Sequence, residues 1–393
     1  MTDDFAAVLV INAGSSSLKY QLVQPVSGIV RGSGLIERIG GPVSELRHTG
    51  PGGTTRSESR IPDATAAFAA MVDGFAAHGP DLAKQPPIAV GHRVVHGGTR
   101  FSAATLVDAG VRTEIEQLVP LAPLHQPANL AGIDAAAALF PDLPQVAVFD
   151  TAFHGTIPPA AHTYAVPQQW REEYAVRRYG FHGTSHRWAS GRAAALLGRA
   201  DARMVVLHLG NGASACAVDS GRSVETSMGL TPLEGLVMGS RSGDIDPAIA
   251  GHLARVAGLS AEQIDTALNQ QSGLRGLVGD NDFRELQDRV DAGDPVAQLA
   301  FDVVVHRLVK YVGAYAATLG RLDAVVFTGG IGENSAALRT AVVEKLALFG
   351  AVLDPTRDAG RGERIVSSPT SRLTVLVVPT DEERQIAMEC VQL

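Results

Sequence analysis

The stretch VLVINAGSSSLKYQL, residues 8–22, places a small polar loop between two apolar runs. Gly14 permits backbone conformations that a side chain would forbid, and the amides and hydroxyls from Asn12 to Ser17 can donate hydrogen bonds to an anion. Lys19 adds a positive charge, so the loop could bind a phosphate. The spacing G-x-x-x-x-G-K-[ST] of a P-loop is absent, and SLKYQLV alternates as a strand does. An ordinary hairpin turn rich in glycine and serine explains this stretch equally well.

Two charged residues stand in or after apolar runs. Arg93 interrupts IAVGHRVVHGG, residues 88–98. An arginine can bind a carboxylate through two parallel hydrogen bonds, and an ion pair between domains is the alternative. Asp150 ends the run QVAVFD, where an α/β sheet presents site residues, although aspartate also caps turns. Each residue is therefore a candidate for binding or catalysis with a structural alternative.

Two further groups of polar residues have the spacing of known local motifs. His182 and His186 are spaced as on one turn of a metal-binding helix, but a glycine replaces the glutamate of H-E-x-x-H, which argues against a zinc protease. Thr380 and Glu383 in VVPTDEERQIA fit a T-x-x-E capping box, so Glu383 could close a helix N-terminus. Glu382 then remains available for another role.

The pattern of apolar residues predicts strands that alternate with helices, as in an α/β domain with partly parallel pairing. A polar segment at 48–62 favours an exposed hairpin or loop. The stretch MVVLHLGNGASACAV, residues 204–218, repeats the pattern of 8–22, which indicates two related domains. Strands are expected at 8–12, 18–24, 28–37, 88–98, 145–150 and in AVVFTGG and LTVLVVPT, and helices at 63–79, 129–140, 246–257, 262–270 and 295–319.

Composition excludes several classes of function. The 393 residues carry a net charge of -8, which argues against a nucleic-acid or anionic-membrane surface. Cys216 and Cys390 are too few for a disulfide framework and lack the spacing of a zinc site. No run of about 18 apolar residues occurs, and the first residues lack a basic n-region. We therefore expect a cytoplasmic protein.

Nine motifs, which follow one another in order between residues 8 and 386, resemble those of the acetate kinase family. They are VINAGSSSLKYQL, GHRVVHGG, APLHQPAN, FDTAFHGTIP, YGFHGTSH, HLGNGAS, ETSMGLTPLEGLVMGSRSGDIDP, NDFR and FTGGIGEN. The two glycine-bearing loops and FTGGIGENS also resemble the nucleotide site of the larger superfamily of acetate and sugar kinases, heat-shock chaperones and actin.

This resemblance implies an α/β fold of two duplicated ribonuclease H-like domains with a nucleotide cleft between them. The N-terminal domain, residues 1–150 joined by a C-terminal helix 385–393, would hold the carboxylate substrate and a phosphate loop. The C-terminal domain, residues 151–384, would bind the nucleotide and form a homodimer. The implied reaction is reversible transfer of the γ-phosphoryl group of ATP to acetate, giving acetyl phosphate and ADP, with Mg²⁺, for which Mn²⁺ can substitute.

The family motifs also imply roles for single residues. Arg93 would bind the substrate, Arg241 and His182 would act on the transferring phosphoryl group, and Asp150 stands where the family has its acid/base residue. Acetate has no proton to lose at neutral pH, so we expect Asp150 to order Mg²⁺-bound water or Arg241. An arginine in a loop such as that of Arg241 is otherwise surface charge. The nucleotide would contact Lys19, His208, Leu209, Gly210, Asn211, Gly212, Asp282, Phe283, Arg284, Gly330, Ile331, Gly332, Glu333 and Asn334.

The metal ligands implied by the resemblance are Asn12 and Glu382, with Asp381 standing where the family pattern has asparagine. For the alkyl end of the acid we expect a small apolar pocket. If Val95 continues the strand of Arg93, it points the same way as Arg93 and can limit the room to about a methyl group. The pocket would consist of Val95, Leu124, Phe181 and Pro232, and their alternative role is in the core.

Two rival functions remain open. A nucleotide-switched binding protein of the chaperone or actin type would need a peptide-binding domain or polymer-forming surfaces, whereas the kinase motifs account for nearly the whole chain. A propionate or butyrate kinase shares most of the motifs. A series of short-chain acids separates the second rival from an acetate kinase.

Overall fold

The computed structural model describes residues 6–393; residues 1–5, which we assigned to the first domain, lie outside the described part. The chain divides into two compact units, which we call unit 1 (residues 1–153 and 381–393) and unit 2 (residues 154–380). Each unit is built on one mixed β-sheet with helices packed against it.

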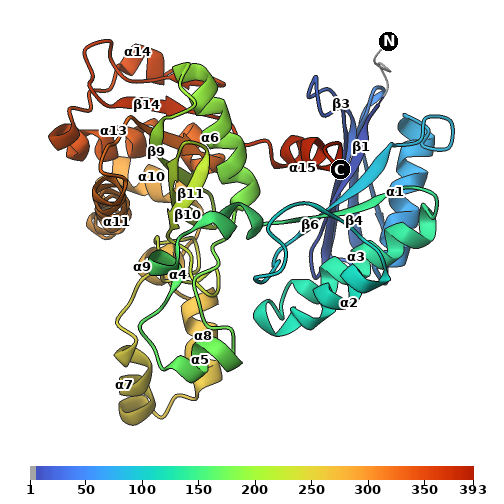
Figure 1. Cartoon of the computed structure of the whole chain (residues 1–393), viewed down its shortest axis with the longest axis horizontal. Helices are drawn as coiled ribbons and strands as arrows, with labels where there is room; N and C mark the ends of the chain where they lie inside the picture. Colours follow the sequence, from blue (N-terminus) through green and yellow to red (C-terminus); the bar gives the residue numbers. More distant parts are fainter. Residues whose placement is uncertain (1–5) are drawn as a thin grey trace. The chain divides into compact units, whose positions relative to one another are not determined.

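Unit 1 contains an eight-stranded sheet in the order β5-β4-β3-β2-β1-β6-β8-β7. Figure 1 labels β1, β3, β4 and β6 of this sheet. The strands β1 to β5 form an antiparallel meander, whereas β1, β6 and β8 are parallel to one another. The strands are β1 (Val8–Ala13), β2 (Ser17–Val23), β3 (Val30–Glu37), β4 (Ser44–Gly50), β5 (Gly53–Ser59), β6 (Ala89–Val94), β7 (Thr105–Leu106) and β8 (Gln145–Phe149). The main helices are α1 (Ala64–His78), α2 (Ala109–Gln117), α3 (Gln126–Leu139) and α15 (Glu382–Cys390).

The alternation of side chains along β1 explains how this sheet is covered on both faces. Leu9 and Ile11 pack in one apolar cluster with residues of α1, whereas Val8 and Val10 pack in another cluster with residues of α15. Successive residues of a strand point to opposite faces, so a strand covered on both sides must be apolar throughout. The sheet is therefore buried between α1 and α3 on one face and α15 on the other.

Unit 2 contains a six-stranded sheet in the order β11-β10-β9-β12-β14-β13, against which α6 and α11 pack. The strands are β9 (Arg203–Leu209), β10 (Ala213–Asp219), β11 (Arg222–Thr226), β12 (Ala324–Thr328), β13 (Arg364–Ile365) and β14 (Thr374–Val377). The helices are α4 (Pro159–His162), α5 (Gln168–Glu173), α6 (Gly183–Leu197), α7 (Ala248–Ala257), α8 (Ala261–Gln270), α9 (Gly273–Val278), α10 (Phe283–Asp291), α11 (Pro295–Leu319), α12 (Gly329–Asn334), α13 (Ala336–Lys345) and α14 (Pro355–Asp358).

The two sheets share one topology. In unit 1 the strands β3, β2 and β1 form an antiparallel meander. The strands β6 and β8 follow in the sheet and are parallel to β1. In unit 2 the order β11-β10-β9-β12-β14 has the same directions. This arrangement confirms the predicted duplication of a ribonuclease H-like domain.

Most predicted elements are present, with changed boundaries. The polar segment at 48–62 is a hairpin whose strands β4 and β5 extend the sheet of unit 1. The predicted strand at 88–98 is shorter, because β6 ends at Val94. The helices α2, α6, α10 and α13 were not predicted. In the described part of the chain, none of the helices has both the length and the apolar character that a membrane crossing needs.

A buried ion pair connects α13 to α14, and the same arginine binds the end of α12 in unit 2. Arg339 and Asp358 are 2% and 3% exposed, and the Arg339 Nε donates to Asp358 Oδ1 at 2.6 Å. The Nη1 of Arg339 also donates to the carbonyl oxygens of Gly332 and Glu333, at 2.8 and 2.9 Å. Removal of one partner from such a pair leaves a buried charge without compensation.

We expect Asp358→Ala to lower the free energy of unfolding by about 3–5 kcal/mol, because the Arg339 charge stays buried. Glu363→Ala is the matched control. It breaks the partly exposed ion pair with Arg192 and should cost about 0–1 kcal/mol. Urea denaturation followed by circular dichroism measures both. Equal losses in the two variants would show that the Arg339 charge finds compensation without Asp358.

Candidate active site

The hairpin of β1 and β2 places two of the predicted site residues opposite each other. Asn12 and Lys19 are direct partners in the antiparallel register, so their side chains lie on the same face of the sheet. The turn between them is closed by the Gly14 amide, which donates to the Ser17 carbonyl oxygen at 2.8 Å. A side chain at Gly14 would meet the Ser17 hydroxyl. Lys19 forms an ion pair with Glu383.

Arg93 and Asp150 form a bidentate ion pair inside unit 1. The Arg93 Nε donates to Asp150 Oδ1 at 3.0 Å, and its Nη2 donates to Oδ2 at 2.7 Å. Asp150 is 2% exposed, while the Arg93 side chain is 21% exposed. The pair exists because β6 and β8 are parallel neighbours and both residues lie near the carboxyl ends of these strands. Neither predicted structural alternative applies: the ion pair is not between domains, and the Asp150 carboxylate binds Arg93.

Charge and burial act against each other at this pair. Burial raises the pKa of Asp150 above its ordinary value, the Arg93 guanidinium opposes that shift, and the Glu382 carboxylate adds to it. Burial by itself would lower the pKa of Arg93, but the charges of Asp150 and then Glu382 raise it above its ordinary value. Glu382 therefore lies close enough to sense both partners.

The start of α15 differs from the predicted capping box. Asp381 is the N-cap, and its Oδ1 accepts from the Arg384 amide at 3.1 Å. Thr380 belongs to unit 2, where its hydroxyl contacts Ser185, so the predicted role of Thr380 and Glu383 in a capping box was wrong. Asp381, one position after Thr380, takes the N-cap position instead, because its short carboxylate reaches the amide of the residue three positions later.

The four residues of the predicted alkyl pocket differ in burial. Val95 lies one residue beyond the end of β6, so the argument from strand alternation does not apply to it. It is half-buried, Pro232 is half-buried, Phe181 is 2% exposed and Leu124 is 71% exposed. Phe181 therefore has the burial of a core residue, and the other three do not.

Asn129 was missed as a positioning residue, although it ends the motif APLHQPAN. Its Oδ1 accepts from the Val95 amide at 3.0 Å, and its Nδ2 donates to the Ala13 carbonyl oxygen at 2.8 Å. One buried amide thus holds the residue after β6 and the end of β1 at a fixed separation. The signal in the sequence was a polar side chain at the end of a family motif, near the start of an alanine-rich helix.

In unit 2 a glycine lies beside two of the predicted catalytic residues. A Cβ at Gly212 would lie 3.1 Å from Arg241 Nη2 and 3.4 Å from His182 Nε2. Arg241 Nη1 donates to the Pro232 carbonyl oxygen at 2.7 Å, and no carboxylate of the described residues forms an ion pair with Arg241. Burial lowers the pKa of Arg241. A half-buried cation without a carboxylate partner is suited to bind an anion.

His182 has an unusual backbone conformation and a fixed ring. Its φ of 57° and ψ of 24° lie in the left-handed region, which is uncommon for a residue with a side chain. The ring Nδ1 lies 3.0 Å from Ser214 Oγ, and the ring centroid lies 4.4 Å from that of His208. His208 in turn has its Nδ1 2.7 Å from Ser185 Oγ.

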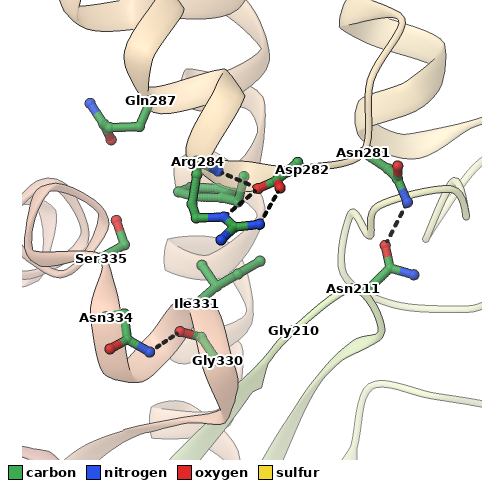
Figure 2. A pocket seen from close by; sticks show the side chains of 11 residues that line it. Gly210, Asn211, Asn281, Asp282, Arg284, Gln287, Gly330, Ile331, Asn334 and Ser335 are labelled. Atoms are coloured by element: carbon green, nitrogen blue, oxygen red, sulfur yellow. Dashed lines mark hydrogen bonds and ion pairs between the residues drawn. The ribbon is translucent and has the colours of Figure 1, made fainter. Parts of the chain in front are cut away.

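A cavity of about 680 Å³ in unit 2 is lined by most of the predicted nucleotide residues (Figure 2). Its size is that of a typical small-molecule site. The lining residues come from the turn after β9, the start of α10 and the segment of α12 and α13: Gly210, Asn211, Asn281, Asp282, Phe283, Arg284, Gln287, Gly330, Ile331, Asn334 and Ser335.

Hydrogen bonds hold the polar walls of this cavity in place. Asp282 caps α10 and also binds the Arg284 guanidinium, with Oδ2 2.6 Å from Nη2. Asn281 Nδ2 donates to Asn211 Oδ1 at 3.2 Å, and Asn334 Nδ2 donates to the Gly330 carbonyl oxygen at 2.8 Å (Figure 2). The Ile331 side chain offers an apolar surface between them.

Some predicted nucleotide residues do not line this cavity, and three lining residues were missed. Leu209 and Gly332 are buried, and Glu333 Oε1 accepts from the Thr380 amide at 3.0 Å. Lys19 belongs to unit 1. Asn281 begins the motif NDFR and Ser335 ends the stretch FTGGIGENS, so both could have been found there, whereas Gln287 carries no signal of its own. The structure also explains Gly239, where a Cβ would collide with Asn211.

Mg²⁺ usually keeps several waters and needs only one or two protein carboxylates beside substrate phosphates. In the described part of the chain, no group of three or more His, Cys, Asp or Glu residues is arranged to hold a metal ion. The carboxylate of Glu382 and the amide oxygen of Asn12 provide the hard oxygen ligands that Mg²⁺ prefers. Oxygen ligands of this kind fit a Mg²⁺ site that uses few protein groups.

Comparison with known proteins agrees with these features. The model of the acetokinase family matches residues 7–388. The chain is 56% identical to the acetate kinase of Leifsonia xyli, over 98% of each chain. The crystal structure of Porphyromonas gingivalis acetate kinase superposes with a TM-score of 0.94 and 42% identity, covering 98% of this chain and 99% of that one. A propionate kinase from Francisella tularensis superposes with a TM-score of 0.92 and 41% identity, covering 98% of each chain. The chain belongs to the acetokinase family.

Proposed function

We propose that the protein transfers the γ-phosphoryl group of ATP to acetate, giving acetyl phosphate and ADP, and that it also catalyses the reverse reaction. One observation carries the proposal. The turn after β9 lines the nucleotide cavity with Gly210 and Asn211, and its next residue, Gly212, adjoins Arg241 and His182. A nucleotide in the cavity would have its phosphates directed along this turn toward the two side chains.

To catalyse phosphoryl transfer, a protein mainly positions two anions, here the acceptor carboxylate and the nucleotide phosphates, and stabilises the charge that develops between them. Arg241 and His182 supply donors for the oxygens of the transferred group in unit 2. In unit 1 Arg93 supplies a guanidinium for the carboxylate of acetate, and Lys19 supplies a charge for the phosphates. Because the same guanidinium is held by Asp150, its planar face is fixed before the substrate arrives.

Asp150 acts in this proposal through Arg93 and not as a base. Acetate is ionised at neutral pH, so no proton has to be removed before it attacks phosphorus. Both oxygens of the Asp150 carboxylate accept hydrogen bonds from Arg93. This role is an alternative to the expectation that Asp150 orders Mg²⁺-bound water or Arg241.

Asn12 and Glu382 are the proposed ligands of Mg²⁺, for which Mn²⁺ can substitute. When bound, the ion would neutralise phosphate charge. We assign the acceptor and phosphate loop to unit 1 and the binding of ATP or ADP, with dimerisation, to unit 2. A homodimer in the cytoplasm is part of the proposal by resemblance to the family.

Propionate is the alternative substrate, because the propionate kinase from Francisella tularensis is as similar as the acetate kinase structures are. The residues expected to contact the alkyl end of the acid, among them Val95 in unit 1, would decide between the two acids. Val95 is half-buried and lies two residues after Arg93 in the sequence, which supports its proposed contact with the acid.

The reaction and the proposed cations are tested together by trapping acetyl phosphate with hydroxylamine. The purified enzyme with acetate, ATP and Mg²⁺ should form acetohydroxamate. Arg241→Ala and His182→Ala should lower kcat by about 10²-fold or more, because each removes a donor to the developing charge. Arg93→Ala should raise the KM for acetate strongly and lower kcat as well. No hydroxamate from the wild type would refute the proposed reaction, and unchanged kcat in both His182 and Arg241 variants would refute their roles.

Val95→Ala should shift the preference toward the longer acid, because it removes two methyl groups beside the bound carboxylate. Wild type should prefer acetate over propionate in kcat/KM by about 10- to 200-fold, the range that one methylene permits. The variant should narrow this ratio and leave the KM for ATP nearly unchanged. Val94→Ala is the control, since Val94 is fully buried and should affect stability without changing the preference. An unchanged ratio in Val95→Ala would place the pocket elsewhere.

Glu382→Gln should raise the Mg²⁺ concentration required for half-maximal activity by about tenfold or more, because the amide has no charge. Glu383→Gln is the matched control. Its carboxylate pairs with Lys19, so the Mg²⁺ requirement should change less. Activity is measured against total Mg²⁺ at fixed ATP. A larger effect in Glu383→Gln than in Glu382→Gln would exchange the two assignments.

A further inference from the structure

A buried serine connects two histidines of unit 2. Ser214 lies in β10 and is fully buried. Its Oγ lies 3.0 Å from His182 Nδ1 and 2.7 Å from His186 Nε2. A hydroxyl has a single proton, so it can donate to one of these nitrogens and must accept from the other. The two histidines therefore cannot choose their tautomers independently.

The environment of His186 decides which way the hydroxyl proton points. His186 is fully buried, and its Nδ1 has no hydrogen-bond partner among the described residues. Burial lowers the pKa of His186 well below its ordinary value, so the ring is neutral. Buried N–H groups without an acceptor are rarer than under-used acceptors. The proton of His186 therefore sits on Nε2, where it donates to Ser214 Oγ.

The remaining step follows from the count of protons. Because Ser214 Oγ accepts from His186, its own proton must be donated to His182 Nδ1. A neutral His182 then carries its proton on Nε2, the nitrogen that lies 3.4 Å from the position of a Cβ on Gly212. We propose that Ser214 and His186 are positioning residues that hold neutral His182 in the tautomer with the proton on Nε2.

This tautomer has a consequence for the proposed reaction, on which the inference rests. The Nε2–H group faces the turn that would carry the phosphates, and it can donate a hydrogen bond to an oxygen of the transferring group. The opposite tautomer would turn a lone pair toward that oxygen and lose the interaction. The left-handed backbone of His182 and its contact with the His208 ring fix the direction of the ring.

The tautomer is tested directly by NMR of enzyme labelled with ¹⁵N histidine. Spectra that correlate ring nitrogens with carbon-bound protons distinguish Nε2–H from Nδ1–H, and loss of a signal in His182→Gln assigns it. Wild type should show His182 as the Nε2–H form at pH 7.5. In Ser214→Ala, the signal should shift to a mixture of both forms, and kcat should fall by about tenfold or more with little change in the KM for acetate.

Matched variants separate the hydrogen-bond chain from packing. His186→Gln keeps an N–H donor toward Ser214 and should keep the His182 tautomer, whereas His186→Ala should lose the preference. Ser185→Ala alters the partner of His208 and should leave the tautomer signal of His182 in place. Circular dichroism checks that each variant is folded.

The outcomes are distinct for this inference and for the proposed function. A wild-type His182 in the Nδ1–H or doubly protonated form would overturn the inference. An unchanged tautomer in both Ser214→Ala and His186→Ala would do so as well. The Nε2–H form in an enzyme whose kcat survives His182→Ala would support the inference and overturn the catalytic role of His182.

Discussion

The parallel pairing of the central strands is the constraint on which both sets of site residues depend. In unit 1 the strands β1, β6 and β8 run in one direction, so their carboxyl ends meet at a single edge of the sheet. Asn12, Arg93 and Asp150 lie at or just beyond these ends. In unit 2 the strands β9, β12 and β14 are parallel in the same way. Their carboxyl ends lead to the turn at Gly210, to Gly330 and to Thr380. In sheets of this kind, ligands bind beside the carboxyl ends of the parallel strands.

Arg93 and Arg241, the two arginines that we propose bind the substrates, are held in opposite ways. Arg93 is held by a buried carboxylate, which costs it some of its positive potential but fixes its orientation. Arg241 is held by the Pro232 carbonyl oxygen, and within residues 6–393 no carboxylate forms an ion pair with it. A carboxylate ligand needs an accurately oriented partner, because two hydrogen bonds must align. A phosphoryl group in transfer carries more charge and changes shape, so a strong field matters more than a fixed angle.

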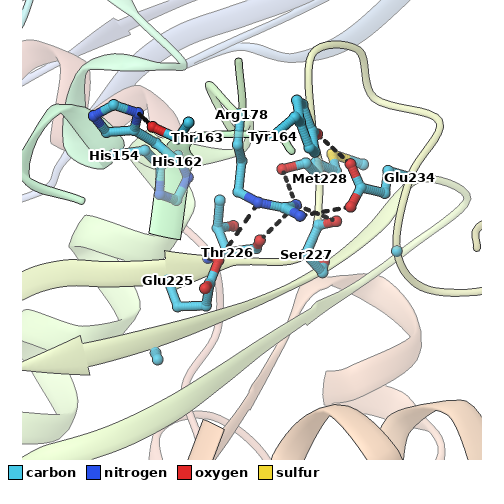
Figure 3. Close-up of polar contacts among 12 residues, drawn as sticks. His154, His162, Thr163, Tyr164, Arg178, Glu225, Thr226, Ser227, Met228 and Glu234 are labelled. Atoms are coloured by element: carbon cyan, nitrogen blue, oxygen red, sulfur yellow. Dashed lines mark hydrogen bonds and ion pairs between the residues drawn. The ribbon is translucent and has the colours of Figure 1, made fainter. Parts of the chain in front are cut away.

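A second network stabilises the loop that carries Arg241. The Arg178 guanidinium donates to the carbonyl oxygens of Thr226, Ser227 and Met228 and to Glu234 at 2.5 Å (Figure 3). Glu234 also accepts from the Tyr164 hydroxyl. One cation thus ties the beginning of the loop to its middle. The backbone before Arg241 is consequently fixed by polar contacts that lie away from the nucleotide cavity.

The sequence was sufficient for features that depend on local pattern. Three features could be predicted because each depends on a short stretch of sequence. They are the alternation along β1 and β2, the Asp63 cap of α1 and the repeat at 204–218. Features that depend on contacts between distant residues could not be predicted in this way. The Arg93 and Asp150 pair joins neighbouring strands, Asn129 joins two strand ends, and Asp381 displaced a capping box that differed from it by one position. Such choices are decided by packing in three dimensions, which a linear pattern does not contain.

The helix α15 follows unit 2 in the sequence but packs in unit 1, and this affects the order in which unit 1 can fold during synthesis. The helix covers the sheet face that Val8, Val10, Val146 and Val148 form, yet it is separated from them by all of unit 2. A ribosome that synthesises the chain from its N-terminus must complete residues 154–380 before this cover exists. During translation that apolar face is exposed, and such surfaces bind chaperones or aggregate. Unit 2 is continuous in sequence, so its sheet can form before the ribosome has synthesised α15, the last helix of unit 1.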